Sequence, residues 1–352
     1  MFGRKFKMKM LVCGAFDFVN MATGGQPVKT RELYWLLCEK YGKENVMYCE
    51  TLGWKRNPIK LFADIIKKAK ICDAAIMLPA QNGLMIFSTV FLFLKKSLGK
   101  KIFYDVIGGW LPEKLSKEPK LAKTISQFDG IWVETETMKN RLEKLGLNNV
   151  TVIPNFKRLT PISSEELYQN GNPPFTLCTF SRVMKEKGIE DAVNAVSEAN
   201  RKLGKTVYTL DIYGQIDGGQ TEWFENLKAT FPEYISYKGV ADPSKSVEVL
   251  KDYFALLFPT RFYTEGVPGT IIDAYFSGTP VISSRWLSFK DVVKEGMTGF
   301  GYAFGEYDEL FGLLEKIANE PIVINSLRNN CLNEAKKYTP QNAISILSSS
   351  LK

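Results

Sequence analysis

The feature that most constrains the fold is a regular alternation of short apolar runs with longer amphipathic stretches. In the first half of the chain, stretches of helical periodicity separate the runs KMLVCGAF, NVMYCE, AAIMLPA, KIFYDVIGG, GIWVET and NVTVIPN. Short apolar strands that alternate with helices predict a parallel sheet covered by helices on both faces.

The alternation stops and then restarts, which predicts two domains. Residues 160–174 are rich in Pro, Gly, Asn and Ser, as expected of a linker. Beyond them the strand-like runs FTLCTFSRV, YTLDIYG, YISYKG, FALLFP and PVISS alternate with helical patterns. We therefore predict an α/β protein of two Rossmann-like parallel-sheet domains, 1–160 and 161–336, followed by a terminal helix in 337–352. Because ligands bind at the carboxyl ends of parallel strands, we expect the two domains to face each other across a cleft.

Composition excludes several classes of protein. The 352 residues are 45% apolar and 24% charged, enough for a large core without disulfides. The six cysteines are scattered without a C-x-x-C pair, which is typical of reduced thiols in a cytosolic protein. The chain contains no histidine, which excludes His metal sites and His general bases. Acid–base chemistry must then come from carboxylates or from the substrate.

Charge favours an anionic partner. The formal net charge is +8, and lysines and arginines are frequent in the first third of the chain, at positions 4, 5, 7, 9, 95, 96, 100 and 101. Such a balance suits phosphates, a nucleotide or an anionic lipid surface, the alternative being an ordinary solvated basic face. The start of the chain reads as a strand and not as a secretion signal.

The longest near-continuous apolar run, 84–94, is too short to span a bilayer, which takes about 20 residues. It is either a buried helix of the first domain or a segment that faces a membrane.

The segment FPTRFYTEGVPGTIIDAYFSGTPVISS (258–284) places two acids around the start of a predicted helix, 268–277. Glu265 precedes this helix and Asp273 lies one to two turns inside it. Unpaired amides around Gly269 and Thr270, backed by the helix dipole, suit a phosphate. The segment therefore offers carboxylates for hydroxyl groups and amides for a phosphate. The alternative is a core helix with incidental acids.

Three further segments lie at predicted strand ends. Arg182 and Lys187 follow the strand FTLCTF and could neutralise a diphosphate without a metal. Gly24 and Gly25 stand between the first strand and its helix and leave bare backbone amides. After the strand KKIFYDV, Gly108, Gly109 and Trp110 could line a sugar pocket, and the Asp105 carboxylate points either there or into the fold.

Neither domain has G-x-G-x-x-G or a P-loop, so we expect no dinucleotide cofactor.

Taken together, these segments resemble the retaining GT-B glycosyltransferases of family 4, in the form found in bacterial capsule and surface-polysaccharide enzymes. The resemblance rests on GGQPVKT, YDVIGGWLP, VIPN, FSRVMKEKG and the 258–284 segment, which is similar to the E-x7-E motif with Asp as the second acid. It covers nearly the whole chain. It implies that the final helix crosses back onto the first domain.

The resemblance also implies roles for residues. Glu265 is implied to contact the donor sugar, Asp273 the ribose, and Arg182 with Lys187 the diphosphate. The other residues implied at the donor are Gly24, Gly25, Gly214, Gly239, Val240, Gly266, Val267, Pro268, Gly269 and Thr270. Those assigned to the sugar and acceptor pocket are Asp105, Gly108, Gly109, Trp110 and Asn155.

The chain departs from many family members at one place, because YDVIGGW stands where they have a His after the fourth strand. Without this His, the phosphate oxygen of the leaving group is expected to accept the proton of the acceptor hydroxyl. Catalysis would then come from stabilising the negative charge on the diphosphate.

The function expected is a metal-independent retaining glycosyltransferase that uses a UDP- or GDP-sugar. The acceptor implied is a growing surface polysaccharide on polyprenyl diphosphate. We expect a cytoplasmic protein, peripheral at the inner membrane face, without a cofactor and without a nucleic-acid partner. The alternatives are a nucleotide-sugar epimerase of the same architecture and a catalytically inactive partner of a glycosyltransferase.

Overall fold

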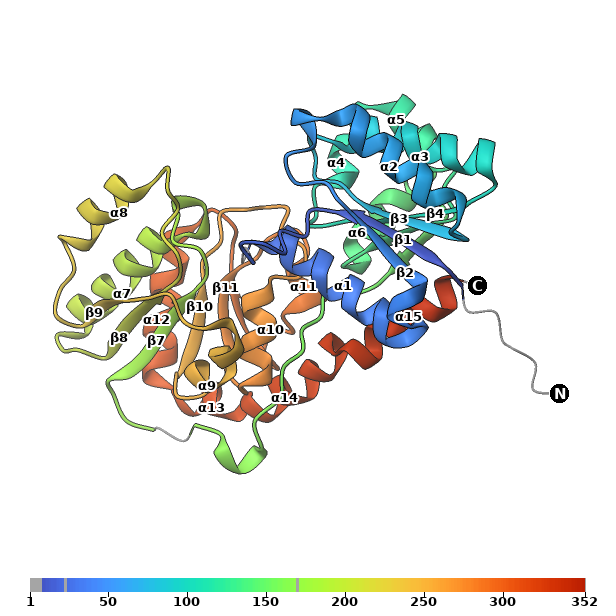
Figure 1. Ribbon diagram of the computed structural model, residues 1–352. Helices are drawn as coiled ribbons and strands as arrows, with labels where there is room; N and C mark the ends of the chain where they lie inside the picture. The colour runs from blue at the N-terminus through green and yellow to red at the C-terminus, as the bar shows by residue number, and fades with distance from the viewer. Residues whose placement is uncertain (1–7, 22–23, 169–170, 352) are drawn as a thin grey trace. The chain divides into compact units, whose positions relative to one another are not determined.

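The computed structural model describes residues 8–21, 24–168 and 171–351 (Figure 1). The chain divides into two compact units, Met1–Lys157 with Pro340–Lys352, and Arg158–Thr339. We call them unit 1 and unit 2. Each holds a six-stranded sheet whose paired strands are parallel, so the predicted α/β class with two parallel-sheet domains is confirmed. Three basic residues of the predicted cationic start, Arg4, Lys5 and Lys7, lie outside the described residues.

The sheet of unit 1 has the strand order β2-β1-β3-β4-β5-β6. Its strands are β1 (Met10–Gly14), β2 (Val46–Glu50), β3 (Ala74–Leu78), β4 (Lys101–Asp105), β5 (Gly130–Val133) and β6 (Val150–Val152). Its helices are α1 (Gly25–Tyr41), α2 (Pro58–Lys70), α3 (Leu84–Leu98), α4 (Leu111–Lys117), α5 (Pro119–Ile125), α6 (Glu136–Glu143) and α15 (Pro340–Ser350).

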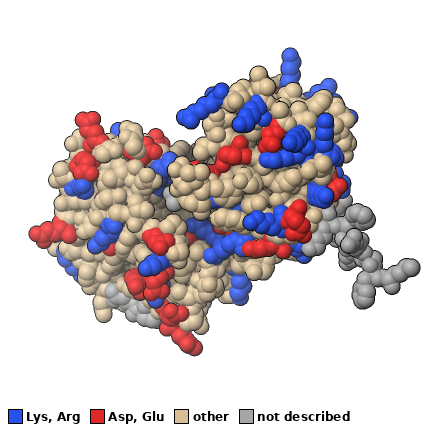
Figure 2. All heavy atoms as spheres, viewed as in Figure 1, with Lys and Arg blue, Asp and Glu red and all other residues tan. Residues whose placement is uncertain are grey.

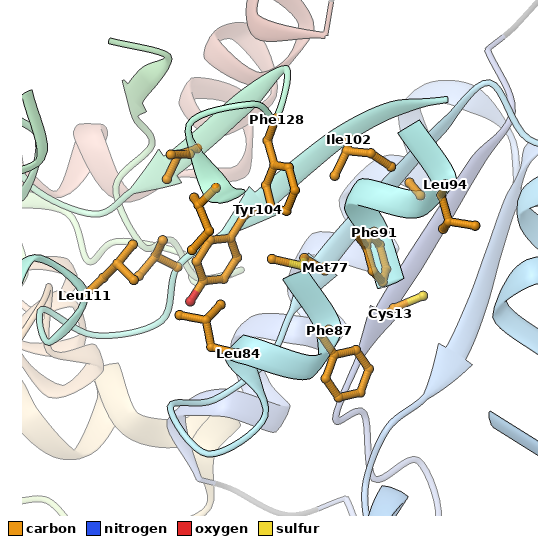
Figure 3. Close-up of a cluster of buried hydrophobic side chains, with 14 of the residues drawn as sticks. Cys13, Met77, Leu84, Phe87, Phe91, Leu94, Ile102, Tyr104, Leu111 and Phe128 are labelled. Carbon is orange, nitrogen blue, oxygen red and sulfur yellow. The ribbon is translucent and has the colours of Figure 1, made fainter. Parts of the chain in front are cut away.

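Two apolar layers hold unit 1 together, one on each face of the sheet. Because side chains alternate along a strand, Leu11 and Cys13 of β1 point to one layer and Met10 and Val12 to the other. The first layer packs against α2, α3 and α5, and Figure 3 shows the α3 side chains entering it. The second layer packs against α1 and α15. The last helix of the chain therefore belongs to the core of unit 1.

The sheet of unit 2 has the order β12-β11-β10-β7-β8-β9. Its strands are β7 (Phe175–Phe180), β8 (Tyr208–Tyr213), β9 (Ile235–Gly239), β10 (Ala255–Phe258), β11 (Val281–Ser284) and β12 (Gly299–Tyr302). Its helices are α7 (Ile189–Leu203), α8 (Thr221–Lys228), α9 (Ser246–Leu250), α10 (Gly269–Phe276), α11 (Phe289–Val292), α12 (Tyr307–Asn319), α13 (Ile322–Ser326) and α14 (Arg328–Ala335).

In unit 2, as in unit 1, the sheet lies between two layers of helices. Helices α7, α8 and α12 cover one face of its sheet, and α9, α10, α11 and α14 cover the other. Short 3-10 turns complete the two units: η1 (Lys43–Asn45), η2 (Trp54–Arg56), η3 (Ser164–Glu166), η4 (Lys185–Lys187), η5 (Pro243–Lys245) and η6 (Lys336–Tyr338). Among the described residues, no helix is long and apolar enough to cross a membrane.

Candidate functional site

The strand order of unit 2 locates the candidate site. The second strand of unit 2, β8, lies on one side of its first strand, β7, and the fourth strand, β10, lies on the other. The direction in which strands are added therefore reverses between β7 and β10. Ligands of open parallel sheets bind outside the carboxyl ends of the strands at such a point. The loops that follow β7 and β10 carry Lys187 and Glu265, which the sequence had singled out.

The Lys187 ammonium forms an ion pair with Oε1 of Glu265. The buried Thr260 hydroxyl donates to the same oxygen at 3.2 Å. Oε2 of Glu265 makes no hydrogen bond with a described residue, and the side chain is 16% exposed. The carboxylate is thus charge-balanced and held on one side, with an acceptor oxygen left for a ligand.

Backbone contacts tie the two loops together. The amide of Arg261 donates to the carbonyl of Glu186 at 2.8 Å. Gly188 has φ +69° and lies against the Pro259 carbonyl so closely that a Cβ would come within 1.9 Å of the oxygen. Only glycine fits this position without a backbone shift.

A side-chain pair adds to this connection. The Arg261 guanidinium donates from Nε to Oδ2 of the buried Asp191 at 2.8 Å, and from a terminal nitrogen to Oδ1 at 2.5 Å. It also lies 4.6 Å from the ring centre of Tyr307. Asp191 lies in the first turn of α7 and Tyr307 begins α12, so Arg261 fixes the β10 loop to both helices.

The start of α10 follows directly after Glu265. Gly266 and Val267 are buried, Pro268 precedes the helix and Gly269 begins it, one residue later than predicted. The first amide that pairs locally is that of Ile271, which bonds the Pro268 carbonyl. The amides of Gly269 and Thr270 make no hydrogen bond with a described residue. The Thr270 hydroxyl is buried and also lacks one. These donors are available to an anion.

Asp273 lies inside α10 and is 3% exposed. The hydroxyl of the buried Ser246, at the start of α9, donates to its Oδ1 at 2.9 Å. The structure therefore places this acid below the surface, bonded to a neighbouring helix.

The remaining residues of unit 2 that are implied at the donor lie at the ends of β7, β8 and β9. The Arg182 side chain is half-exposed, and one of its terminal nitrogens lies 3.6 Å from Oδ2 of Asp217. Gly214 has φ +139° and packs against the Ser181 carbonyl, and its amide donates to the carbonyl of Gly239 at 2.9 Å. Val240 is 64% exposed. The structure thus places Arg182, Gly214, Gly239 and Val240 along one edge of the sheet.

In unit 1, the carboxyl end of the sheet carries a buried cluster of three charges. The Lys29 ammonium lies 3.0 Å from Asp105 and 2.9 Å from Glu134, and it donates to the Val106 carbonyl at 2.7 Å. Burial raises the pKa of Asp105 to about 6, although Lys29 opposes the shift. Of the two orientations left open for Asp105, the structure has the one into the fold. Its assignment to a sugar pocket is therefore corrected.

The other residues assigned to unit 1 lie at the same edge of its sheet. Gly24 caps the start of α1 and Gly25 is its first residue. Gly108 has φ +74°, and the indole of Trp110 donates to the Ile107 carbonyl at 2.8 Å and packs on the core, half-buried. Asn155 is half-buried after β6 and accepts from the Phe156 amide through its side-chain oxygen.

Sequence reasoning missed the residues that position these groups. Thr260 and Arg261 lie before Glu265 in the segment 258–284, and Lys29 lies in 24–30, but the spacing of these residues indicated no role. Ser246, Asp191 and Glu134 carry no local signal, because their partners are distant in the chain. Among the described residues, no group of three His, Cys, Asp or Glu could hold a metal ion.

Chemically, the site of unit 2 pairs a carboxylate oxygen for hydroxyl groups with cations and free amides for phosphate oxygens. Such a set can hold a sugar linked to a diphosphate.

Comparisons with known proteins agree with this chemistry. Residues 174–319, most of unit 2, match the family model of the glycosyl transferases, group 1. The chain is 37% identical over 114 residues to the GtfA subunit of the UDP-N-acetylglucosamine–peptide N-acetylglucosaminyltransferase of Streptococcus pneumoniae. That alignment covers 32% of this chain and 21% of the relative.

A second curated relative is the capsular polysaccharide biosynthesis glycosyltransferase CapM of Staphylococcus aureus. It is 23% identical over 170 residues, which is 47% of this chain and 42% of CapM. The chain thus spans less than half the length of either relative.

Among solved structures, HepE of Anabaena in complex with UDP is similar over 98% of this chain and 99% of its own, with a TM-score of 0.76 and 14% identity. At this identity the likeness shows the fold alone. The family match and the glycosyltransferase relatives support a transferase. The chain has the GT-B fold of the glycosyltransferases, and its match to their group 1 family lies in unit 2.

Proposed function

We propose that the protein is a retaining glycosyltransferase of family 4 that transfers a sugar from a UDP- or GDP-sugar to a growing surface polysaccharide. The observation that carries the proposal is the Lys187–Glu265 pair in the loops after β7 and β10, in which Oε2 of Glu265 has no hydrogen-bond partner among the described residues. HepE binds UDP in its crystal structure, and CapM acts in capsule synthesis, which supports a nucleotide-sugar donor and a surface-glycan product.

In this proposal Glu265 accepts hydrogen bonds from hydroxyls of the donor sugar. Lys187 and Arg182 neutralise the diphosphate, and the amides of Gly269 and Thr270 bind its oxygens. Donors aimed at the diphosphate stabilise the charge that develops as it leaves. Gly214, Gly239 and Val240 flank the nucleotide. Asp273 contacts the ribose in this proposal, although in the structure it is buried and its Oδ1 accepts a hydrogen bond from Ser246.

The transfer step breaks the bond between the anomeric carbon and the diphosphate oxygen. The acceptor hydroxyl oxygen bonds to that carbon on the same face, so the anomeric configuration is retained. The hydroxyl proton passes to the leaving diphosphate oxygen, and no side-chain base is needed in a chain without histidine. No metal or cofactor enters the step.

The acceptor in this proposal is an oligosaccharide on polyprenyl diphosphate at the inner membrane face, to which the protein binds peripherally from the cytoplasm. Gly24 and Gly25 of unit 1 serve the donor. Gly108, Gly109, Trp110 and Asn155 of unit 1 serve the sugar and the acceptor.

A panel of UDP-, GDP- and dTDP-sugars, without added metal, tests the proposal. Calorimetry measures binding of each donor, and nucleoside diphosphate release measures turnover. We expect one nucleotide class to bind, and Glu265→Gln and Arg182→Ala to reduce turnover at least tenfold. The matched controls are Glu198→Gln and Arg201→Ala, which form an exposed pair with each other on α7. They should leave both readouts unchanged.

The other outcomes separate the alternatives. Donor isomerised without an acceptor would identify an epimerase, and donor bound without any turnover would indicate an inactive partner. Failure of every donor to bind would exclude a nucleotide-sugar enzyme.

A further inference from the structure

Helix α3 has two apolar faces, and only one of them is used by the fold. Phe87, Phe91 and Leu94 are buried in the core layer shown in Figure 3. On the opposite face Met85 is 59% exposed, Ile86 44% and Phe93 50%. The run 84–94 is therefore neither a fully buried helix nor a wholly exposed one. An exposed apolar stripe of this kind normally marks a binding surface.

The neighbours of α3 are basic. Helices α2, α3 and α5 lie side by side over the same core layer (Figure 1). Asp64 is the single acidic residue of the three helices, and it pairs with Lys68 at 2.7 Å. Six of their lysines are exposed and form no ion pair with a described residue: Lys60, Lys67, Lys70, Lys96, Lys120 and Lys123.

The two kinds of side chain share one surface. We call the exposed side of these three helices the α2–α3–α5 face. Besides the α3 stripe it presents Ile59, which is 83% exposed at the start of α2. Figure 2 shows that Lys and Arg outnumber Asp and Glu over this part of unit 1. Lysines around an apolar stripe match the charge and the chemistry of an anionic lipid bilayer, with headgroups for the ammonium groups and acyl chains for the apolar ones.

We infer that the α2–α3–α5 face is a membrane-binding surface for anionic bilayers. Met85, Ile86 and Phe93 enter the boundary between headgroups and acyl chains, and the six lysines bind the headgroups. A nucleic acid would use the lysines but would leave the aliphatic side chains without a partner. The inference rests on the peripheral membrane binding in the proposed function, and it identifies the surface of unit 1 that would bind. Its test does not depend on sugar transfer.

Co-sedimentation with vesicles measures the interaction. The full chain is mixed with vesicles of phosphatidylcholine alone, and with vesicles of phosphatidylcholine and phosphatidylglycerol in equal parts. We expect binding to the anionic vesicles only, weakening as salt rises. The triple variant Lys60→Glu/Lys67→Glu/Lys96→Glu should bind at least tenfold more weakly. The matched control is Lys205→Glu/Lys245→Glu/Lys316→Glu, which makes the same charge change at exposed lysines of unit 2. This control should bind anionic vesicles with the same affinity as the unsubstituted protein.

A second variant separates lipid insertion from simple charge attraction. Met85→Ser/Phe93→Ser keeps every lysine and should still lose at least threefold in vesicle affinity. Circular dichroism and donor binding, unchanged in both test variants, show that they are folded. Equal loss in the unit 2 control, no loss in the Ser variant, or tighter binding of a single-stranded RNA than of anionic vesicles would each overturn the inference.

Discussion

At the residue scale, two lysine–carboxylate groups of the same chemistry sit in different surroundings. Lys187 and Glu265 keep 18% and 16% of their side chains exposed, so a ligand can reach them. Lys29, Asp105 and Glu134 keep 7% or less. With all three groups ionised, their charges sum to −1, and burying charge at low dielectric is costly. We therefore assign the first group to binding. The second is part of the packing of unit 1, where the ionised Asp105 costs stability.

The buried cluster predicts a pH dependence of stability. Burial raises the pKa of Asp105 from 3.8 to about 6. Between these pH values the unfolded chain has lost this proton and the folded chain keeps it, so the contribution of Asp105 to stability falls as pH rises. Relative to the parent, Asp105→Asn should gain stability from pH 4 to pH 7, on the order of 3 kcal/mol. Urea unfolding of both proteins at each pH measures this, and a constant difference would contradict it.

Arg261 predicts a second stability effect, in unit 2. Its removal leaves the buried Asp191 carboxylate unpaired. Because the Arg261 side chain is 41% exposed, we expect Arg261→Ala to cost about 1–3 kcal/mol. The double variant Arg261→Ala/Asp191→Asn should be more stable than Arg261→Ala alone, since no charge is then stranded. Denaturant unfolding of Arg261→Ala, Asp191→Asn and the double variant forms the test, and additive losses would exclude the pairing.

At the scale of elements, the site depends on two neighbouring strand-to-helix loops that are held at a fixed distance. Lys187 comes from the β7–α7 loop and Glu265 from the β10–α10 loop. The contact between Gly188 and the Pro259 carbonyl lets these loops approach each other. The glycine at the other end of α7, Gly204, has a similar φ of +65° but no atom within 4 Å of an added Cβ.

These two glycines make a matched pair of substitutions. Gly204→Ala should cost about 1 kcal/mol, because its backbone conformation disfavours a side chain. Gly188→Ala should cost more and should also weaken UDP binding severalfold, because the clash pushes Lys187 away from Glu265. Thermal unfolding and titration with UDP measure the two effects. Equal effects of both substitutions on UDP binding would show that the loop contact does not matter for the site.

At the scale of the whole molecule, the last residues of the chain complete the first unit. Ala343, Leu347 and Leu351 are buried in the layer that α15 shares with α1, and the Trp132 indole donates to the Ser350 hydroxyl at 2.8 Å. Unit 1 is therefore built from both ends of the chain, whereas unit 2 is one continuous segment.

This connectivity predicts an effect confined to one unit. Leu347→Ala should cost about 2–5 kcal/mol, because it opens a cavity in a fully buried position. Hydrogen exchange should then rise in β1 and β3 but not in β7 and β10, as peptide-level mass spectrometry would show. The exposed neighbour Ser349 gives the control, since Ser349→Ala should change neither unit. Faster exchange throughout both units would contradict the division.

The sequence by itself determined the element types and the chemistry at their ends. The spacing of apolar residues predicted strands and helices, and Pro and Gly around Gly269–Phe276 predicted α10 to within a residue or two. It also marked Glu265, Lys187 and Arg182 as strand-end residues. These signals are local, because periodicity, capping and turn preference act within a few residues.

Tertiary structure alone decided which of these residues meet. Lys187 and Glu265 are 78 residues apart, and Lys29 and Glu134 are 105 apart. The strand order that brings them together depends on burial against distant elements, which no local pattern encodes. The same holds for α3, whose sequence is apolar on both faces, since packing against the sheet selects the buried one. The burial of Asp105 also depends on this packing, because the lysine that pairs with it, Lys29, comes from α1.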